Sequence, residues 1–179
     1  MFENLREHIG IQLTRFQFRH RPDQVLEFTN ALSKAKTALV VMPFDTLTTS
    51  STVNLLRTLR TKFKDKNLTL VLGEHNTEIP LEMRHCDILH LYDHELNQIF
   101  LPRKTIINRI RRKRYDVAID LNLDFILPTA YICKASEAKV RIGFVKQHAD
   151  MFYNFQIQKD ARKKPAVTYD FLALCFKMF

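Results

Sequence analysis

Short apolar runs recur along the chain, separated by segments in which apolar residues follow a helical spacing. Each run is rich in aliphatic or β-branched side chains, which is typical of buried strands. The predicted strands are Ala38–Met42, Leu68–Leu72, Asp87–Tyr92, Asp116–Leu121, Lys139–Phe144 and Phe152–Ile157. Strands that alternate with helices indicate an α/β fold. We expect a Rossmann-like three-layer αβα domain with a mainly parallel sheet.

One strand–helix–strand unit in this pattern is especially clear. It consists of the strand Asp116–Leu121, the helix Phe125–Ala135 and the strand Lys139–Phe144. Asn122 and Asp124 follow the first strand as turn and helix-cap residues. Ligand sites in such sheets lie at the carboxyl ends of strands. Asp120, Asn122 and Asp124 are therefore candidate site residues.

The first 35 residues are predicted to form a helical extension before an α/β domain of residues 36–179. Within Met1–His20, apolar side chains recur at helical spacing at Phe2, Leu5, Ile9, Leu13 and Phe16. Ile11 and Phe18 fall off this stripe. The stripe is expected either to pack on the domain or to lie on an anionic membrane. A second helix is predicted from Pro22 to Ser33.

A strongly basic segment closes a long helix predicted from Glu95 to Arg114, which Pro102 can break. Seven of its last twelve residues are Lys or Arg, more than compensation of the helix dipole requires. Arg111, Arg112 and Lys113 are candidate ligands for phosphate groups, and a solvated basic face is the alternative. A final apolar helix is predicted over Val167–Phe179.

Composition adds a preference for an anionic partner. The chain has 179 residues, 46% of them hydrophobic, and a formal net charge of +9, which suits one globular domain. Such a charge favours nucleic acid, acidic lipid or a phosphorylated glycolipid. Aromatic side chains are not interleaved with the basic run, which disfavours single-stranded nucleic acid. The three glycines are too scattered to form a dinucleotide or phosphate-binding loop.

Neither a membrane span nor a metal site is expected from the sequence. No apolar run approaches the roughly 20 residues that cross a bilayer, and the first ten residues lack a signal-peptide core, so a cytoplasmic protein is expected. The three cysteines lack metal-type spacing and are expected to be reduced. Cys86 and His90 lie about 13 Å apart if they occupy one strand, too far for a shared zinc ion.

Two segments carry a resemblance to a known family. The pattern YDVAIDL, an apolar helix and then RIGF resembles the N-terminal, acceptor-side domain of family 9 glycosyltransferases, the heptosyltransferases of the lipopolysaccharide inner core. The second segment is the strand Ala38–Met42, a Ser/Thr-rich loop and the helix containing LLRTLR. The resemblance implies a two-domain enzyme whose second domain binds a nucleotide sugar such as ADP-heptose. That domain would need about 150 further residues, so we expect this chain to lack it and to bind no cofactor.

The family's catalytic loop corresponds to Phe44–Ser51. In the family this loop carries a Gly-Asp pair whose aspartate serves as the general base, and the alignment places the pair at Leu47 and Thr48. A threonine hydroxyl is no base near neutral pH, so a roughly hundredfold rate contribution would be missing. Asp45 and Asp120 are the candidate substitute bases, with a cap role as the alternative for Asp45.

The hydroxyl-rich run in the same loop suggests an anion site. Thr48, Thr49 and Ser50 precede a helix predicted from Thr52 to Phe63, and their hydroxyls could hold a phosphate or simply cap the helix.

Three functional hypotheses follow. The leading one is a degenerate or partial heptosyltransferase-like domain that binds an anionic glycan, a glycolipid or a partner protein without transferring sugar alone. The second is the acceptor-side half of an active glycosyltransferase, hexosyl- or heptosyl-transferring, completed by a separate donor-binding chain. Peripheral contact with the inner membrane accompanies both. The third, a nucleic-acid-binding protein, is supported by charge alone.

Overall fold

The computed structural model describes residues 2–19, 23, 25–75, 83–160 and 162–178. Its centre is a sheet of six described strands, all parallel, in the order β3-β2-β1-β4-β5-β6. The strands are β1 (Ala38–Val41), β2 (Leu68–Gly73), β3 (Asp87–Leu91), β4 (Val117–Asp120), β5 (Val140–Phe144) and β6 (Phe155–Ile157). The predicted Rossmann-like α/β fold is confirmed.

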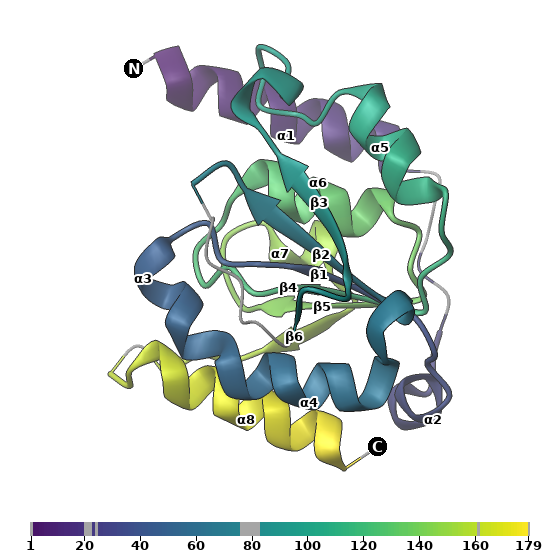
Figure 1. Ribbon diagram of the computed structural model, residues 1–179. Helices are drawn as coiled ribbons and strands as arrows, with labels where there is room; N and C mark the ends of the chain where they lie inside the picture. The colour runs from purple at the N-terminus through teal and green to yellow at the C-terminus, as the bar shows by residue number, and fades with distance from the viewer. Residues whose placement is uncertain (1, 20–22, 24, 76–82, 161, 179) are drawn as a thin grey trace.

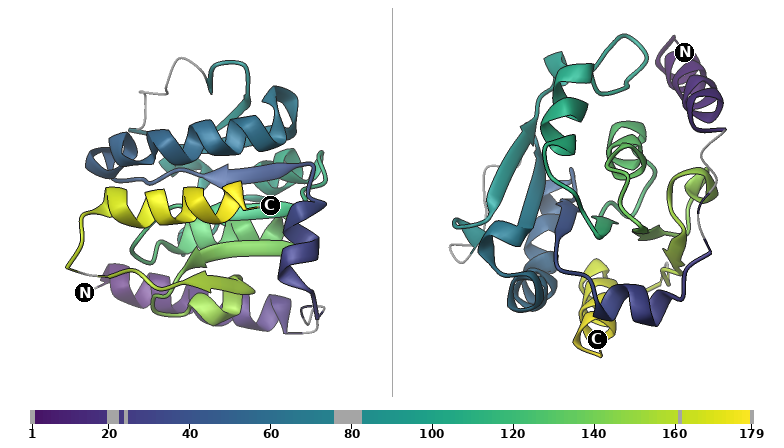
Figure 2. Two further views of the ribbon diagram at one scale, coloured as in Figure 1. Left: turned by 90° about the horizontal axis from the view of Figure 1, so that it is seen from below. Right: turned by 90° about the vertical axis from the view of Figure 1, so that its right-hand side faces the viewer.

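Helices cover both faces of this sheet (Figures 1 and 2). One face is covered by α2 (Phe28–Ser33), α4 (Val53–Phe63) and α8 (Pro165–Lys177). The other is covered by α5 (Lys104–Arg111), α6 (Leu127–Ala135) and α7 (Ala149–Phe152). Side chains alternate along each strand, so Val40 faces the first helix layer and Val41 the second. The central strands are fully buried because both faces are covered.

The sheet reverses direction of winding between β1 and β4. Val41 pairs with Val71 on one side and with Asp120 on the other. Loops leave these two strands toward opposite faces, and the point where the winding reverses is the usual ligand position in open parallel sheets.

The N-terminal helix α1 (Phe2–Phe18) lies outside the second helix layer, over α6 and the loop before α5 (Figure 1). Its buried residues are Gly10, Ile11, Thr14 and Phe18. The predicted stripe is therefore not the packed face: the helix packs through the two apolar residues that lie off the stripe and through small residues that allow close approach. A Cβ on Gly10 would overlap the carbonyl oxygen of Ile99 and lie 2.7 Å from Leu127 Cδ2.

Of the long helix predicted from Glu95 to Arg114, only the part after the possible break at Pro102 is helical. Asp93–Glu95 forms one 3₁₀ turn, a loop follows, and α5 begins only at Lys104. The Asn97 side chain accepts hydrogen bonds from the backbone N–H groups of Ile99 and Leu101, at 3.0 and 2.9 Å. This side-chain bonding replaces helical bonding, since Asn competes for backbone donors in turns.

Other predicted boundaries shift by a few residues. The helix after β4 begins at Leu127, and the second helix covers only Phe28–Ser33. The final helix begins at Pro165, two residues early, because proline suits a first helical turn. Phe152 belongs to α7, so the last strand is shorter than predicted. Of the predicted ends, Met1, His20, Pro22 and Phe179 lie outside the described residues.

Candidate functional site

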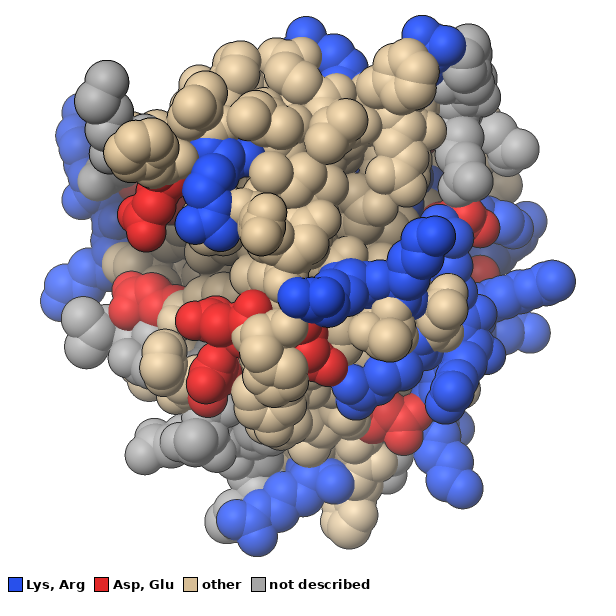
Figure 3. Space-filling view, turned by 90° about the horizontal axis from the view of Figure 1, so that it is seen from above, with Lys and Arg blue, Asp and Glu red and all other residues tan. Residues whose placement is uncertain are grey.

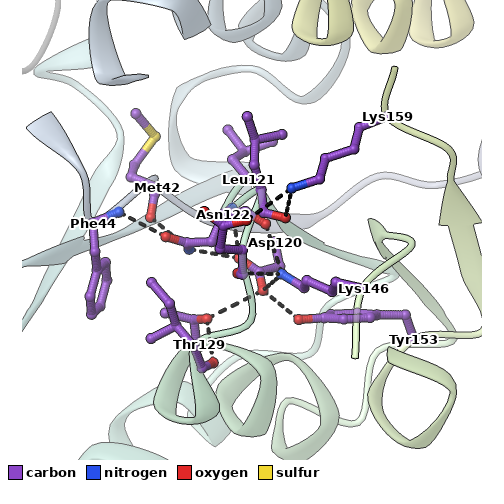
Figure 4. Close-up of polar contacts among 12 residues, drawn as sticks. Met42, Phe44, Asp120, Leu121, Asn122, Thr129, Lys146, Tyr153 and Lys159 are labelled. Carbon is purple, nitrogen blue, oxygen red and sulfur yellow. Dashed lines mark hydrogen bonds and ion pairs between the residues drawn. The ribbon is translucent and has the colours of Figure 1, made fainter. Parts of the chain in front are cut away.

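The candidate site is the carboxyl edge, meaning the ends of the strands and the loops that leave them. At its centre lies Asp120, the last residue of β4, which is wholly buried (Figure 4). One carboxylate oxygen accepts hydrogen bonds from the backbone N–H and side-chain amide of Asn122, at 3.0 and 2.7 Å. The other faces Lys146 Nζ at 3.1 Å, the Thr129 hydroxyl at 3.2 Å and the Tyr153 hydroxyl, which donates to it.

Lys146 completes the charge balance of this cluster. Its side chain is 4% exposed, and its ammonium donates to Asp120, to the Asn122 carbonyl at 2.7 Å and to the Asp124 carbonyl at 3.2 Å. Three acceptors match the three donors of an ammonium group. The ammonium also lies 5.3 Å from the centre of the Tyr153 ring. Both buried charges are thus paired and hydrogen-bonded, as burial of ions requires.

Asn122 joins the ends of β1 and β4 across the switch in winding. Its amide oxygen accepts from the backbone N–H of Phe44 at 2.8 Å, and its amide nitrogen donates to the Met42 carbonyl at 3.1 Å (Figure 4). The side chain is 3% exposed. Asn122 therefore fixes the first residues of the predicted catalytic loop against the exit of β4.

Burial shifts the pKa of two neighbours of Asp120. Burial, reinforced by the adjacent carboxylate, raises the pKa of the Tyr153 phenol well above its ordinary value. The same two causes, in the same order, raise the pKa of the Cys133 thiol. Both groups are therefore neutral at physiological pH, and Tyr153 serves as a hydrogen-bond donor to Asp120.

The packing of this cluster requires the glycine of the RIGF sequence, Gly143. A Cβ on Gly143 would lie 2.6 Å from the Tyr153 ring, because the ring rests directly on the backbone of β5. Glycine at this position lets the phenol reach Asp120. One motif of the family resemblance thus has a physical role in building the carboxyl edge.

The predicted catalytic loop begins beside Asn122. Asp45 is exposed, and its carboxylate accepts a 2.7 Å hydrogen bond from the hydroxyl of Thr48, which is 8% exposed. The Thr49 hydroxyl lies 3.3 Å from the Asp45 carbonyl, and Ser50 is exposed. Asp45 is thus joined to the first helical turn, α3 (Thr46–Thr49), through the Thr48 hydroxyl, which puts a carboxylate next to Thr48.

Asp124 stands at the outer rim of the same edge. Its side chain is 92% exposed and pairs with Lys159 at 2.9 Å. Lys159 also donates to the Leu123 carbonyl at 3.0 Å, and the Tyr169 hydroxyl donates to the Leu121 carbonyl at 2.7 Å. The loop after β4 is therefore held by one side chain from the segment after β6 and one from α8.

The structure separates the basic candidates from the others. Arg111, Arg112 and Lys113 lie where α5 ends and the chain enters β4, at the amino edge of the sheet. Arg111 pairs with Glu137 at 3.0 Å, and Lys113 pairs with Asp87. Arg111 and Lys113, together with Arg114 and Lys139, line a hollow of about 590 Å³, the amino-edge hollow. A ligand bound between Asp120 and these bases would have to cross the sheet from end to end.

Four residues that contact the site were not predicted from the sequence: Lys146, Tyr153, Thr129 and Lys159. Lys146 carries the same signal as Asp120, because it follows the carboxyl end of a strand, and that rule could have found it. Tyr153 gives no such signal, since it lies between α7 and β6 and reaches Asp120 only through the fold.

The described residues contain no cluster of three or more potential metal ligands. His90, which was weighed above as a zinc ligand, lies in the edge strand β3. The rings of His90, Tyr92 and His94 stack, with centroids 5.8 and 5.5 Å apart. None of the helices in the described part of the chain has the length and hydrophobicity needed to cross a bilayer.

The fold was compared with those of known proteins. No protein-family model and no curated protein matches the chain. Among solved structures, the E. coli heptosyltransferase WaaC with ADP is similar, with a TM-score of 0.61 at 16% sequence identity. The chain is similar in fold to family 9 glycosyltransferases. A family 9 glycosyl transferase from Veillonella parvula DSM 2008 gives a TM-score of 0.58, also at 16% identity.

The similarity covers most of this chain but only part of those enzymes. It spans 78% of this chain and 46% of WaaC, and 79% of this chain and 40% of the Veillonella protein. The chain thus matches less than half the length of either structure. The resemblance stated from the sequence is confirmed as a likeness of fold.

Proposed function

We propose that this chain is a degenerate acceptor-side domain of the heptosyltransferase type, which binds an anionic glycan or glycolipid at the carboxyl edge without transferring sugar by itself. The observation that carries the proposal is Asn122, which fastens the loop after β1 to the exit of β4 where the winding of the sheet reverses. Open parallel sheets bind their ligands at this place. A buried, fully paired network beneath it supplies the rigidity that a binding site needs.

Binding without transfer follows from the groups present at this edge. Asp120 has both oxygens occupied and no exposed surface, so it positions Asn122, Lys146 and Tyr153 rather than receiving a substrate proton. Thr48 stands at the position that aligns with the family's base, and a hydroxyl cannot accept a proton there. Asp45 is exposed and lies beside Thr48, which leaves it as the candidate base if the domain retains activity.

The anionic ligand is proposed to contact Lys159 together with the hydroxyls of Thr49 and Ser50. Lys159 is partly exposed, with 31% of its side chain accessible, and its partner Asp124 is open to solvent. The net charge of +9 would attract such a ligand over longer distances. In this proposal the protein acts in lipopolysaccharide biosynthesis, at the cytoplasmic side of the inner membrane.

Calorimetric titration tests this proposal. The full chain is titrated with a phosphorylated lipopolysaccharide inner-core acceptor, with an ADP-sugar and with a short duplex DNA, each at low and high salt. Saturable acceptor binding that survives high salt, without donor binding, is expected. Lys159→Ala should weaken acceptor binding about tenfold, since one charge-assisted hydrogen bond is lost. The exposed Lys163→Ala should not. Equal binding to all three ligands that vanishes in salt would overturn the proposal.

A second candidate is an active transferase formed with a separate donor-binding chain. The observation that favours it is the outer face of α8, where Phe171, Leu174 and Met178 are 56%, 58% and 77% exposed. Beside them lies a groove of about 780 Å³ between α4 and α8. Turnover that appears only in a complex with a donor-binding protein, and is lost in Asp45→Asn, would favour this function over binding alone.

A further inference from the structure

The outer face of α1 presents five large apolar side chains to solvent. Phe2 and Phe16 are 83% and 62% exposed, and Leu5, Ile9 and Leu13 are 57%, 42% and 49% exposed. At 3.6 residues per turn these five residues fall within a sector of about 80°. We refer to them as the α1 stripe. A contiguous stripe of this kind on a folded domain marks an interaction surface.

The α1 stripe takes no part in packing α1 on the domain. The helix already buries Gly10, Ile11, Thr14 and Phe18 on its inner side, and the Gln17 side chain accepts a 3.0 Å hydrogen bond from the Tyr131 hydroxyl of α6. The position of the helix is therefore fixed by contacts that do not use the stripe. The two faces together make a helix that is apolar on both its inner and its outer side.

Charges on α1 are sorted around the stripe. Arg19, directly after the helix, lies beside the stripe, whereas at 3.6 residues per turn Glu3 and Glu7 lie toward the domain. Arg6 is turned toward the domain, where its guanidinium donates to the Gln98 carbonyl and lies 4.6 Å from the centre of the Phe100 ring. The Arg19 guanidinium lies 4.1 Å from the centre of the Phe16 ring, which holds a cation directly beside the apolar surface. An apolar stripe with a cation at its border is an arrangement found in helices that lie in a membrane interface.

A second source of positive charge lies on the same side of the molecule. Both α1 and α5 lie above the sheet, and Figure 3 looks down on this side. It shows a broad area without charged side chains, with a concentration of Lys and Arg on one flank and a smaller group of Asp and Glu on another. The segment from Arg103 to Arg114 contributes seven basic residues and no acidic one, and Arg112 and Arg114 are exposed.

We infer that the α1 stripe and the basic end of α5 together dock this protein on the surface of an anionic lipid bilayer. The stripe enters the boundary between headgroups and acyl chains, and the bases lie over the headgroups. A second copy of this chain is a poorer occupant, because pairing through this side would bring two basic α5 ends together. The inference is independent of the glycan-binding proposal, since the lipids need carry no sugar.

Vesicle sedimentation of the full chain tests this inference. Phosphatidylcholine vesicles are compared with vesicles that also contain phosphatidylglycerol. Binding should be at least about tenfold stronger to the anionic vesicles, because each basic residue near the surface contributes on the order of 1 kcal/mol. Leu5→Gln with Phe16→Gln should weaken binding to anionic vesicles by about tenfold or more, since the anchor would lose its apolar area.

A matched control exists on α8, on the opposite side of the molecule (Figure 1). Phe171→Gln with Leu174→Gln also removes one Phe and one Leu, and these are exposed to the same degree as Phe16 and Leu5. This control should bind vesicles as the unaltered protein does. All variants replace exposed side chains, and their thermal unfolding is compared first.

Several outcomes would overturn the inference. They are absence of binding to anionic vesicles, equal binding to both vesicle types, and equal loss in the α1 and α8 variants. Conversion of a dimer to a monomer by the α1 substitutions would also overturn it, since the stripe would then bind a second copy. None of these outcomes bears on calorimetric binding of the glycan acceptor, which uses no vesicles.

Discussion

At the scale of single residues, Asp120 depends on Lys146. A carboxylate without exposed surface is tolerated only while its charge is balanced and its oxygens are hydrogen-bonded. Lys146 balances the charge, and Asn122, Thr129 and Tyr153 provide further hydrogen-bond partners. Removal of one member of such a pair leaves an uncompensated buried charge, which is more costly than the pair itself is stabilising.

Lys146→Met should therefore lower the free energy of unfolding by about 3–5 kcal/mol. Lys159→Ala breaks the exposed pair with Asp124 and should cost at most about 1 kcal/mol, because solvent screens that pair. Urea unfolding followed by circular dichroism measures both. Similar losses in the two variants would show that Asp120 does not depend on Lys146.

Two buried tyrosines predict a loss of stability at alkaline pH. Burial, with the nearby Asp120 carboxylate, raises the pKa of Tyr153 and of Tyr169 above the ordinary value of 10.0. Unfolded phenols lose their protons above pH 10, whereas the folded ones keep them. Stability is then fully present below pH 10 and falls as the pH rises toward the raised values, by up to about 1.4 kcal/mol per pH unit for each phenol.

Tyrosinate absorbance and ellipticity, recorded together during an alkaline titration, check this expectation. Part of the absorbance should appear only with cooperative unfolding. If all five tyrosines ionised near pH 10 while the fold persisted, the phenols would not be buried beside Asp120 as described.

At the scale of elements, α1 is held by close approach of backbones. Gly10 lies against the Ile99 carbonyl in the loop that Asn97 organises. Alanine normally stabilises a helix relative to glycine by about 1 kcal/mol. Here the added methyl group meets a backbone carbonyl, which cannot move aside as a flexible side chain could.

Gly10→Ala should consequently destabilise the protein by about 1–3 kcal/mol, as overpacking does. Gln12→Ala, at an exposed position of the same helix, should change stability by less than about 0.5 kcal/mol. Thermal and urea unfolding compare the two. A Gly10→Ala protein as stable as the unaltered one would mean that α1 does not contact the loop before α5.

The same scale shows where sequence patterns succeed and where they do not. Every predicted strand exists, because fully buried parallel strands are marked by their own apolar runs. Of the two alternatives for the stripe of the first helix, packing on the domain is not what the structure shows, because the inner face of α1 uses Gly10 and Thr14, which carry no apolar signal. The helix predicted after Glu95 failed because the Asn97 side chain bonds to backbone N–H groups of a turn, which a periodicity argument does not detect.

At the scale of the molecule, the two groups of candidate ligand residues occupy opposite ends of the sheet. The strand-end rule correctly brought Asp120, Asn122 and the loop after β1 together. The basic run directly precedes the predicted strand Asp116–Leu121, so the same reasoning, applied to the start of that strand, could have placed the run at the amino edge. Tyr153, in contrast, reaches Asp120 only in the assembled fold.

The two ends of the sheet offer different surroundings to an anionic ligand. The carboxyl edge offers the winding switch, hydroxyls and Lys159, whereas the amino-edge hollow offers a higher density of bases. The bases of the hollow are partly neutralised by Glu137 and Asp87. Specific binding is therefore expected at the carboxyl edge, and weaker, salt-sensitive binding at the hollow.

Hydrogen–deuterium exchange of the full chain, with and without a phosphorylated inner-core acceptor, separates the two ends most directly. Our account predicts that the acceptor slows exchange in residues 42–50 and 120–124, at high salt as well as low. Slowed exchange confined to residues 111–116 and 136–139, with the carboxyl edge unchanged, would contradict it. The family-like edge would then not be the binding site of this protein.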